Sequence, residues 1–195
     1  MSELQIFAEN VWTVDGPPEY FIGIPFPTRM IIVRLADGAL WVNSPVSAKS
    51  ETIHEIESLG PVRYLVAPTK LHVWRLEGWH ARFPRTELWG PPQIPTKFRK
   101  LPFTGVLGDT PPTQWAEDLG QLVFRGNPLI QEVFFYHKLS RTVILADFIQ
   151  NHRTEPGSLM HNVLVRLDGI AYPHGGVPRD IRLSFHKTRS GASLS

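Results

Sequence analysis

Cysteine is absent from the sequence. A chain without cysteine cannot form disulfides, thiolate-bound zinc sites or iron–sulfur clusters, and it has no cysteine nucleophile. Any metal would therefore bind histidine, carboxylate or water. The sequence also lacks an uninterrupted apolar run of about 18 residues, which a membrane-spanning helix requires. The first residues, MSELQIFAENVW, do not form a basic segment followed by an apolar one, so we expect a cytoplasmic protein without a signal peptide or a membrane partner.

A strong excess of one charge is missing as well. The chain has 20 Lys and Arg residues and 18 Asp and Glu residues, so its formal net charge is only +2, which predicts no nucleic-acid partner. Three familiar motifs are also absent, namely the P-loop, the dinucleotide-binding G-x-G-x-x-G and the hydrolase G-x-S-x-G.

The overall composition is that of a globular protein, with 42% hydrophobic and 19% charged residues. A chain of 195 residues is long enough for one core, so we expect a single domain over residues 1–195. Proline is abundant, and its 18 residues cluster in loops that divide the chain into short elements.

The first half of the sequence has the pattern of an antiparallel meander followed by alternating helices and strands. Runs of β-branched and aromatic residues predict strands at 6–16, 28–36, 39–46, 62–68 and 86–92. Residues 36–38, Ala-Asp-Gly, predict a hairpin turn. Apolar residues at helical spacing predict helices at 47–60 and 71–84.

The second half is dominated by predicted strands. The apolar runs place them at 121–127, 132–136, 142–147 and 162–172. Alternation in R-D-I-R-L-S-F-H-K (179–187) predicts an edge strand with a charged face. We expect His54 and His137 to be solvated surface residues.

Six segments together resemble the metallo-β-lactamase fold superfamily and, within it, the DUF4336 family of short bacterial proteins. They are NVWTVDG (10–16), FPTRMIIVRLADGALWVNSPV (26–46), LGPVRYLVAPTKLH (59–72), WHARFPRTELWGPP (79–92), VFFYHKLSRTVILADFI (133–149) and GGVPRDIRLSF (175–185). The resemblance implies an α/β (α+β) fold, a four-layer αββα sandwich of two mixed sheets. It also implies a site along the edge where loops leave the two sheets.

The resemblance further implies a metal-dependent hydrolase, because active relatives hold one or two zinc or iron ions that convert water to hydroxide. Their ligands include an H-x-H-x-D-H motif after the strand that corresponds to residues 62–68, a later His, an Asp at the end of a hairpin, and a last His near the C-terminus. Here APTKLHVW (67–74) offers His72 alone, and 124–132 has Asn127 and no His. Asp147 matches the hairpin aspartate. We also expect the chain to lack the family's C-terminal end.

Three residues are candidates for the site, and each has an ordinary structural alternative. Asp147 ends an apolar strand as a metal ligand would, or it is a turn residue. His72 is a metal ligand or general base, or it bonds the backbone at a helix start. His174 lies beside two glycines whose N–H groups could form an anion nest, or it lies in a plain turn.

These observations leave three functions open. The first is a hydrolase of this fold with a degenerate metal site and weak or absent activity, since first-row metals bind poorly to two or three ligands. The second is a working hydrolase in which His72, Asp147 and His174 hold one zinc, iron or manganese ion and His72 serves as ligand or base. The third is a non-catalytic module that binds a small-molecule ligand or assembles as a homo-oligomer.

Overall fold

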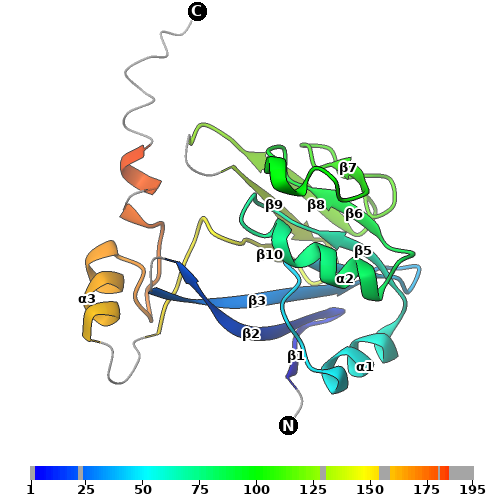
Figure 1. The fold of residues 1–195 in the computed structure, drawn as a ribbon, viewed down its shortest axis with the longest axis horizontal. Helices are drawn as coiled ribbons and strands as arrows, with labels where there is room; N and C mark the ends of the chain where they lie inside the picture. Colours follow the sequence, from blue (N-terminus) through cyan, green and yellow to red (C-terminus); the bar gives the residue numbers. More distant parts are fainter. Residues whose placement is uncertain (1–2, 22–23, 128–130, 154–158, 180, 185–195) are drawn as a thin grey trace, which may run out of the picture.

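The structure is a computed structural model that describes residues 3–21, 24–127, 131–153, 159–179 and 181–184. It contains two sheets, helices on the outer face of the larger sheet, and a further helix beside a long hairpin (Figure 1). None of the helices in these ranges has the length and apolar character needed to cross a membrane.

The larger sheet has seven strands whose spatial order follows the sequence. They are β1 (Leu4–Ala8), β2 (Val11–Phe21), β3 (Ile24–Arg34), β4 (Leu40–Asn43), β5 (Val62–Val66), β6 (Glu87–Gly90) and β7 (Phe103–Val106). The strands from β1 to β4 are antiparallel, whereas those from β4 to β7 are parallel. The change of direction occurs where helical crossovers replace hairpins. The sheet is therefore mixed.

Helices supply those crossovers. They are α1 (Ser50–Leu59), the 3-10 turn η1 (Val73–Arg75) with α2 (Leu76–Arg82), and the 3-10 turn η2 (Thr96–Phe98). The predicted hairpin turn at 36–38 is confirmed, because Gly38 has a φ of 84° and its N–H donates to the Leu35 carbonyl at 2.9 Å. The predicted helices at 47–60 and 71–84 are confirmed with shorter bounds.

The smaller sheet contains β8 (Leu119–Phe124), β9 (Glu132–His137) and β10 (Thr142–Ile144), in the order β10-β9-β8. Both of its strand pairs are antiparallel, whereas we expected this sheet to be mixed as well. The reason is local, since its strands follow one another without a helical crossover. The expected α+β class with two sheets is confirmed.

Two apolar cores lie on the two faces of the larger sheet. The first joins α1 and α2 to that sheet through Ile53, Ile56, Leu76 and Trp79. The second lies between the sheets and is rich in aromatic residues; Trp41 of β4 contacts Phe135 of β9 edge-on, with ring centroids 4.8 Å apart. β4 is therefore buried on both faces, which is typical of a central strand.

Several segments differ from the sequence prediction. The single strand predicted at 6–16 is divided by a turn at 9–10 into β1 and β2, and β7 was not predicted. Residues 162–172 do not form a strand; most of them belong to α3 (Leu159–Asp168), which ends at Gly169 with a φ of 78°. The Ile170 N–H donates to the Val165 carbonyl at 3.0 Å, as expected at a helix that ends in glycine. Residues 181–184 are helical instead of an edge strand, and 185–187 lie outside the described residues.

The second core makes a stability prediction that two leucines of β8 can test. Leu119 is 0% exposed in the core between the sheets, whereas Leu122 on the outer face is 55% exposed. We expect Leu119→Ala to lower the free energy of unfolding by about 2 to 5 kcal/mol, because it leaves a cavity. Leu122→Ala should change it by about 0.5 kcal/mol or less. Urea denaturation measures both, and equal losses would contradict this two-sheet packing.

Candidate functional site

The site begins at the edge where β4 and β5 end. These strands are parallel neighbours, so their carboxyl ends lie together. Ser44 follows β4, and its N–H donates to the Val66 carbonyl at the end of β5 at 2.9 Å. The loop after β5 then carries Thr69 and His72. Ser44 is thereby held against the loop that contains His72.

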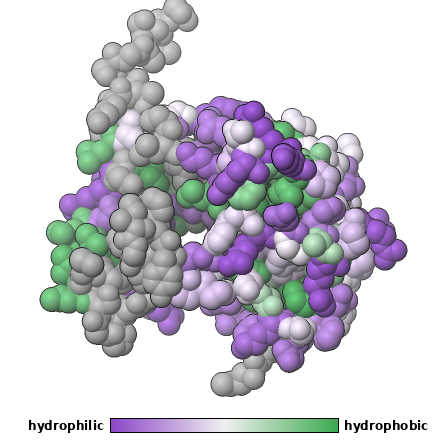
Figure 2. Space-filling model, in the orientation of Figure 1, coloured by the Kyte–Doolittle hydropathy of each residue, from purple (hydrophilic) through white to green (hydrophobic). Residues whose placement is uncertain are grey.

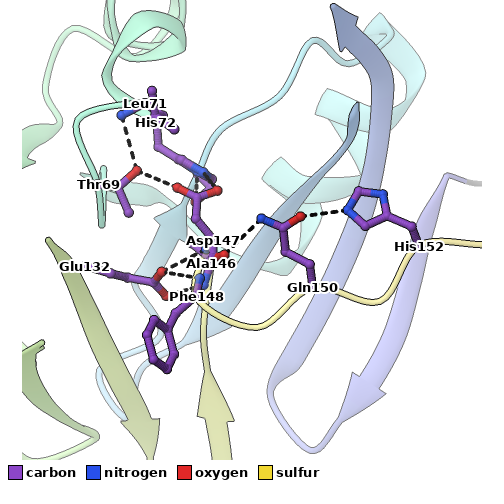
Figure 3. A network of polar contacts seen from close by, with 10 residues as sticks. Thr69, Leu71, His72, Glu132, Ala146, Asp147, Phe148, Gln150 and His152 are labelled. Carbon is purple, nitrogen blue, oxygen red and sulfur yellow. Dashed lines mark hydrogen bonds and ion pairs between the residues drawn. The ribbon is translucent and has the colours of Figure 1, made fainter. Parts of the chain in front are cut away.

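The smaller sheet brings the second half of the site. At the start of β9 the Val133 N–H donates to the Pro68 carbonyl at 3.0 Å, which attaches this sheet to the loop before His72. The preceding residue, Glu132, is 0% exposed. Its carboxylate accepts hydrogen bonds from the N–H groups of Ala146, Asp147 and Phe148 at 2.5, 2.8 and 2.7 Å (Figure 3). Glu132 thus fixes the turn that carries Asp147.

His72 and Asp147 meet at the centre of the site, as Figure 3 shows. Their contact joins His72 Nε2 and Asp147 Oδ1 at 3.1 Å. The second carboxylate oxygen, Oδ2, accepts a hydrogen bond from Thr69 Oγ1 at 2.8 Å, and Thr69 Oγ1 in turn accepts one from the Leu71 N–H at 3.2 Å. The side chains of His72 and Asp147 are 24% and 21% exposed, so the pair lies in a partly open edge.

The other ring nitrogen of His72 faces Ser44, with Nδ1 and Oγ 2.6 Å apart. An ionised carboxylate only accepts hydrogen bonds, so Nε2 carries a proton in contact with Asp147. In the neutral imidazole Nδ1 then has a free lone pair and accepts the Ser44 hydroxyl proton. Ser44, His72 and Asp147 therefore form one continuous chain of hydrogen bonds.

The charges of the pair favour its ionised form. Burial lowers the pKa of His72, but the charge and hydrogen bond of Asp147 and the charge of Glu132 outweigh burial and raise this pKa above 6.5. Burial raises the pKa of Asp147, but His72 and Thr69 outweigh it and hold this pKa below 3.8. Burial also raises the pKa of Glu132 above 4.5, although its three N–H donors act in the opposite direction.

His174, the third candidate, is not brought into this pair. It is exposed, and among the residues that the structure describes no three His, Asp or Glu side chains are grouped so that they could hold a metal ion. The neighbouring glycines do not form an anion nest. The Gly175 N–H donates to the Ala171 carbonyl at 3.1 Å, and the Gly176 N–H donates to the Gln150 carbonyl at 2.8 Å. The backbone around His174 is therefore a plain turn, the second of the two alternatives that the sequence left open.

The side chains of the pair do not fit a metal ion. A ligand must offer a free lone pair, and its partners usually orient it from the far side. Here His72 and Asp147 point at each other, the second nitrogen faces Ser44, and the second oxygen faces Thr69. His72 could bind a metal only after losing one of its two hydrogen bonds, and the part of the chain that the structure describes offers no third ligand to offset that loss.

Three residues of the site were missed from the sequence, namely Ser44, Thr69 and Glu132. Ser44 had a readable signal, because a strand, a helix and a second strand in succession predict a parallel pair whose carboxyl ends meet. Thr69 lies in the loop already singled out for His72. Glu132 had no signal, since a carboxylate at the start of an apolar strand is ordinarily a solvated edge residue.

A pocket of about 420 Å³ lies next to this network. Gln150 connects the two, because its Nε2 donates to the Asp147 carbonyl at 3.1 Å and its Oε1 lies 2.8 Å from His152 Nε2 (Figure 3). The described part of its lining is largely apolar and comes from β3, α3 and the segments beside them: Phe26, Gln150, His152, Leu164, Val165, Leu167, Asp168, Ile170, Pro178 and Ile181. Figure 2 shows apolar surface over α3 at the left of the molecule.

With two stacked sheets and a polar site where their strands end, the chain has the fold of the metallo-β-lactamases. It matches a crystal structure of DIM-1 metallo-β-lactamase exposed to ceftazidime with a TM-score of 0.62, 12% identity and 97% coverage of both chains. A metallo-β-lactamase from Hirschia baltica matches with a TM-score of 0.60, 13% identity, and coverage of 95% of this chain and 96% of that one. The mono-zinc form of FIM-1 from Pseudomonas aeruginosa matches with a TM-score of 0.54, 11% identity, and coverage of 96% and 94%.

The chain belongs to the DUF4336 family, a domain of unknown function, whose sequence profile matches residues 8–172. The family resemblance drawn from the sequence is thereby confirmed, and the fold that it implied is the observed one. No curated protein matches the chain. Because the matched lactamases share so little sequence with this chain, they define its fold only, and its chemistry has to be inferred from the residues of the site.

The ion pair predicts a particular dependence of stability on pH. The pKa of His72 is raised above 6.5 in the folded state, so its contribution is fully present below pH 6.5 and is lost as the pH rises through the folded value. The pKa of Asp147 is lowered below 3.8, so its contribution is present above pH 3.8 and is lost as the pH falls further. We expect the stability difference between the native protein and His72→Gln to be largest between pH 3.8 and 6.5.

Urea denaturation at a series of pH values measures this difference. His54→Gln is the matched control, since His54 is exposed on α1, and its stability difference should not follow the same profile. A His72→Gln difference that grows as the pH rises from 6 to 9 would contradict the ion pair.

Proposed function

We propose that this protein is a hydrolase of the metallo-β-lactamase fold with a degenerate metal site, and that its remaining activity is modest and independent of metal. His72 acts as the general base, and Asp147 orients it and balances the charge that it gains. The observation that carries this proposal is the contact between His72 Nε2 and Asp147 Oδ1 at 3.1 Å.

Several features support an acid–base role for this pair. A general base needs a fixed tautomer and a partner that stabilises its protonated form. Asp147 meets both needs, and it is itself held by Thr69 and by the turn that Glu132 anchors. The pair lies at the ends of strands from two sheets, where a substrate can approach from solvent.

Esters of small carboxylic acids are the substrate class that this site suits. Their cleavage needs a base and a nucleophile, and an activated leaving group needs little protonation. Phosphate esters are less suitable, because the two carboxylates of the site, Asp147 and Glu132, would repel a phosphate dianion.

The test is hydrolysis of p-nitrophenyl acetate by the native chain in the presence of excess EDTA. His72→Gln removes the base and Asp147→Asn removes the orienting charge, so we expect each variant to lower the rate by about 10² to 10⁴-fold. His174→Ala, which changes an exposed residue outside the pair, should leave the rate unchanged.

Metal content measured on the same preparations separates the alternatives. Near-stoichiometric zinc, iron or manganese that disappears in both the His72 and Asp147 variants, together with activity lost in EDTA, would replace this proposal with a mononuclear metal hydrolase. A native rate equal to that of His72→Gln would rule out the hydrolase.

A second candidate function is the binding of an apolar small molecule without catalysis, and the pocket between β3 and α3 favours it. The dye 8-anilinonaphthalene-1-sulfonate serves as the probe. Leu164→Glu places a charge at the pocket, so we expect it to weaken dye binding by about tenfold or more, because an unpaired charge is costly in apolar surroundings.

Val163→Glu is the matched control. Val163 is the neighbouring residue on α3, is similarly exposed, and is not among the described residues that line the pocket. Fluorescence titration should give the native affinity for this variant. Equal weakening by both substitutions would indicate general surface binding and would remove the pocket as a ligand site.

A further inference from the structure

Ser44 has an unusual backbone for a residue at the end of a buried strand. Its φ is 55°, in the left-handed region that residues with a Cβ adopt rarely. Among the described residues two other non-glycine residues share this feature, Asn10 and Arg141, and both lie in tight turns between antiparallel strands. Ser44 instead leaves a central strand toward a helical crossover. Backbone strain at such a position is typical of functional sites.

The surroundings hold Ser44 in this conformation. Its N–H is bonded to the Val66 carbonyl, and Pro45 fixes its own φ at the first position after the turn. The resulting turn directs the hydroxyl to His72 Nδ1 at 2.6 Å. A serine presented by a sharp turn after a strand, within reach of a histidine, is an arrangement that activates a nucleophile.

Both ring nitrogens of His72 are occupied, and this decides which proton the base can take. Nε2 contacts Asp147, whose carboxylate cannot donate while it is ionised, and Nδ1 contacts the Ser44 hydroxyl. A water molecule could reach His72 only after displacing one of these partners. The Ser44 proton is therefore the one that the base is placed to remove.

A buried acceptor lies beside this serine. Asn43 is 1% exposed, and its Oδ1 has no hydrogen-bond partner among the described residues. Buried polar atoms are nearly always paired, so the unpaired oxygen of the residue that precedes Ser44 in the chain is open to a donor supplied by solvent or a ligand.

We propose that Ser44, His72 and Asp147 form a nucleophile–base–carboxylate triad and that Ser44 is the nucleophile of an acyl-enzyme. This proposal rests on the hydrolase function proposed above. Ser44 is 5% exposed, so the acyl groups it accepts are small, such as acetyl.

The two steps balance without a co-reactant other than water. Ser44 Oγ forms a bond to the carbonyl carbon of the ester while its proton passes to His72 Nδ1; the bond to the leaving alkoxide then breaks, and the alkoxide takes that proton. In the second step water attacks the acyl carbon and gives a proton to Nδ1. The bond from the carbon to Oγ breaks, and Oγ recovers the proton.

The chain contains an internal comparison for this triad. His137 is buried, and its Nδ1 lies 2.7 Å from Ser140 Oγ, so it repeats the serine–histidine contact. Among the described residues no carboxylate forms a hydrogen bond with the His137 ring, so this contact lacks a counterpart of Asp147. Burial lowers the pKa of His137, unlike that of His72. Ser140 should therefore be unreactive.

The test is covalent labelling of the full chain with methanesulfonyl fluoride, a small reagent that sulfonylates activated serines and releases fluoride. Intact-mass measurement and peptide mapping should find one sulfonyl group, on Ser44. His72→Gln should slow labelling by about 100-fold or more. Ser140→Ala should be labelled like the native protein.

Ser44→Gly removes the hydroxyl and suits the positive φ, so it keeps the fold without the strain that Ser44→Ala would retain. We expect no sulfonyl label on Ser44→Gly, and hydrolysis of p-nitrophenyl acetate slower by about 10² to 10⁴-fold. Circular dichroism checks that it is folded.

The outcomes separate this proposal from the function on which it rests. If native protein and Ser44→Gly hydrolyse the ester equally in a His72-dependent manner, the hydrolase stands and the triad is overturned. If Ser44 is labelled at a rate that depends on His72 while no ester is hydrolysed, the activated serine stands and the hydrolase falls. Absence of label on native Ser44 overturns the triad.

Discussion

The buried carboxylate of Glu132 holds the site together. It receives three backbone N–H groups from residues 146–148, and the next residue of β9 bonds the loop that carries His72. A carboxylate removed from water is costly unless its oxygens are well bonded, and bonds to an ionised acceptor are the stronger kind. This one residue therefore couples the turn of Asp147 to the loop of His72. Asp147 could not keep its distance from His72 if that coupling were lost.

The packing of the two sheets also sets the distance between His72 and Asp147. Ser44 and His72 follow strands of the larger sheet, whereas Asp147 follows β10 of the smaller one. Between the sheets Phe135 and Trp115 pack edge-on against Trp41, with their ring centroids 4.8 and 6.4 Å, respectively, from that of Trp41. Because a close-packed core resists compression and expansion, these rings fix the spacing at which the polar residues meet. The stability of the core and the geometry of the site are thus linked.

The same arrangement explains why the fold and the metal chemistry need not go together. A metal site in this position requires imidazole and carboxylate lone pairs that converge on one empty point. Here the two titratable side chains converge on each other, and hydroxyl groups of Ser44 and Thr69 occupy their remaining positions. An ion pair of this kind favours proton transfer, since one partner can gain a proton while the other balances its charge. The chain has the metallo-β-lactamase fold, and the chemistry that we propose for the residues at its edge does not use a metal.

The sequence by itself determined most strands of the first half and α1 with its glycine stop, and it singled out His72 and Asp147 as candidates for a site. It could do so because hydrophobic periodicity and turn residues are local, and because His72 lies in the loop after one apolar strand and Asp147 follows another. The two-sheet fold followed from the resemblance to a known family. Local alternation misread 162–172 as a strand, since the burial of Val165 in α3 and of Ile170 just after it depends on what packs against them. It also placed His137 on the surface, although that residue, the last of β9, is buried.

Only the tertiary structure decided which polar groups meet. His72 and Asp147 are 75 positions apart, and their contact depends on how two sheets stack, a distance that no periodicity encodes. The same stacking buried Glu132, turned the His72 ring so that one nitrogen faces Ser44, and left His174 in an exposed turn. Strand patterns specify which face of each element is buried; hydrogen bonds between elements form only after those faces have packed, so the sequence pattern alone does not determine them.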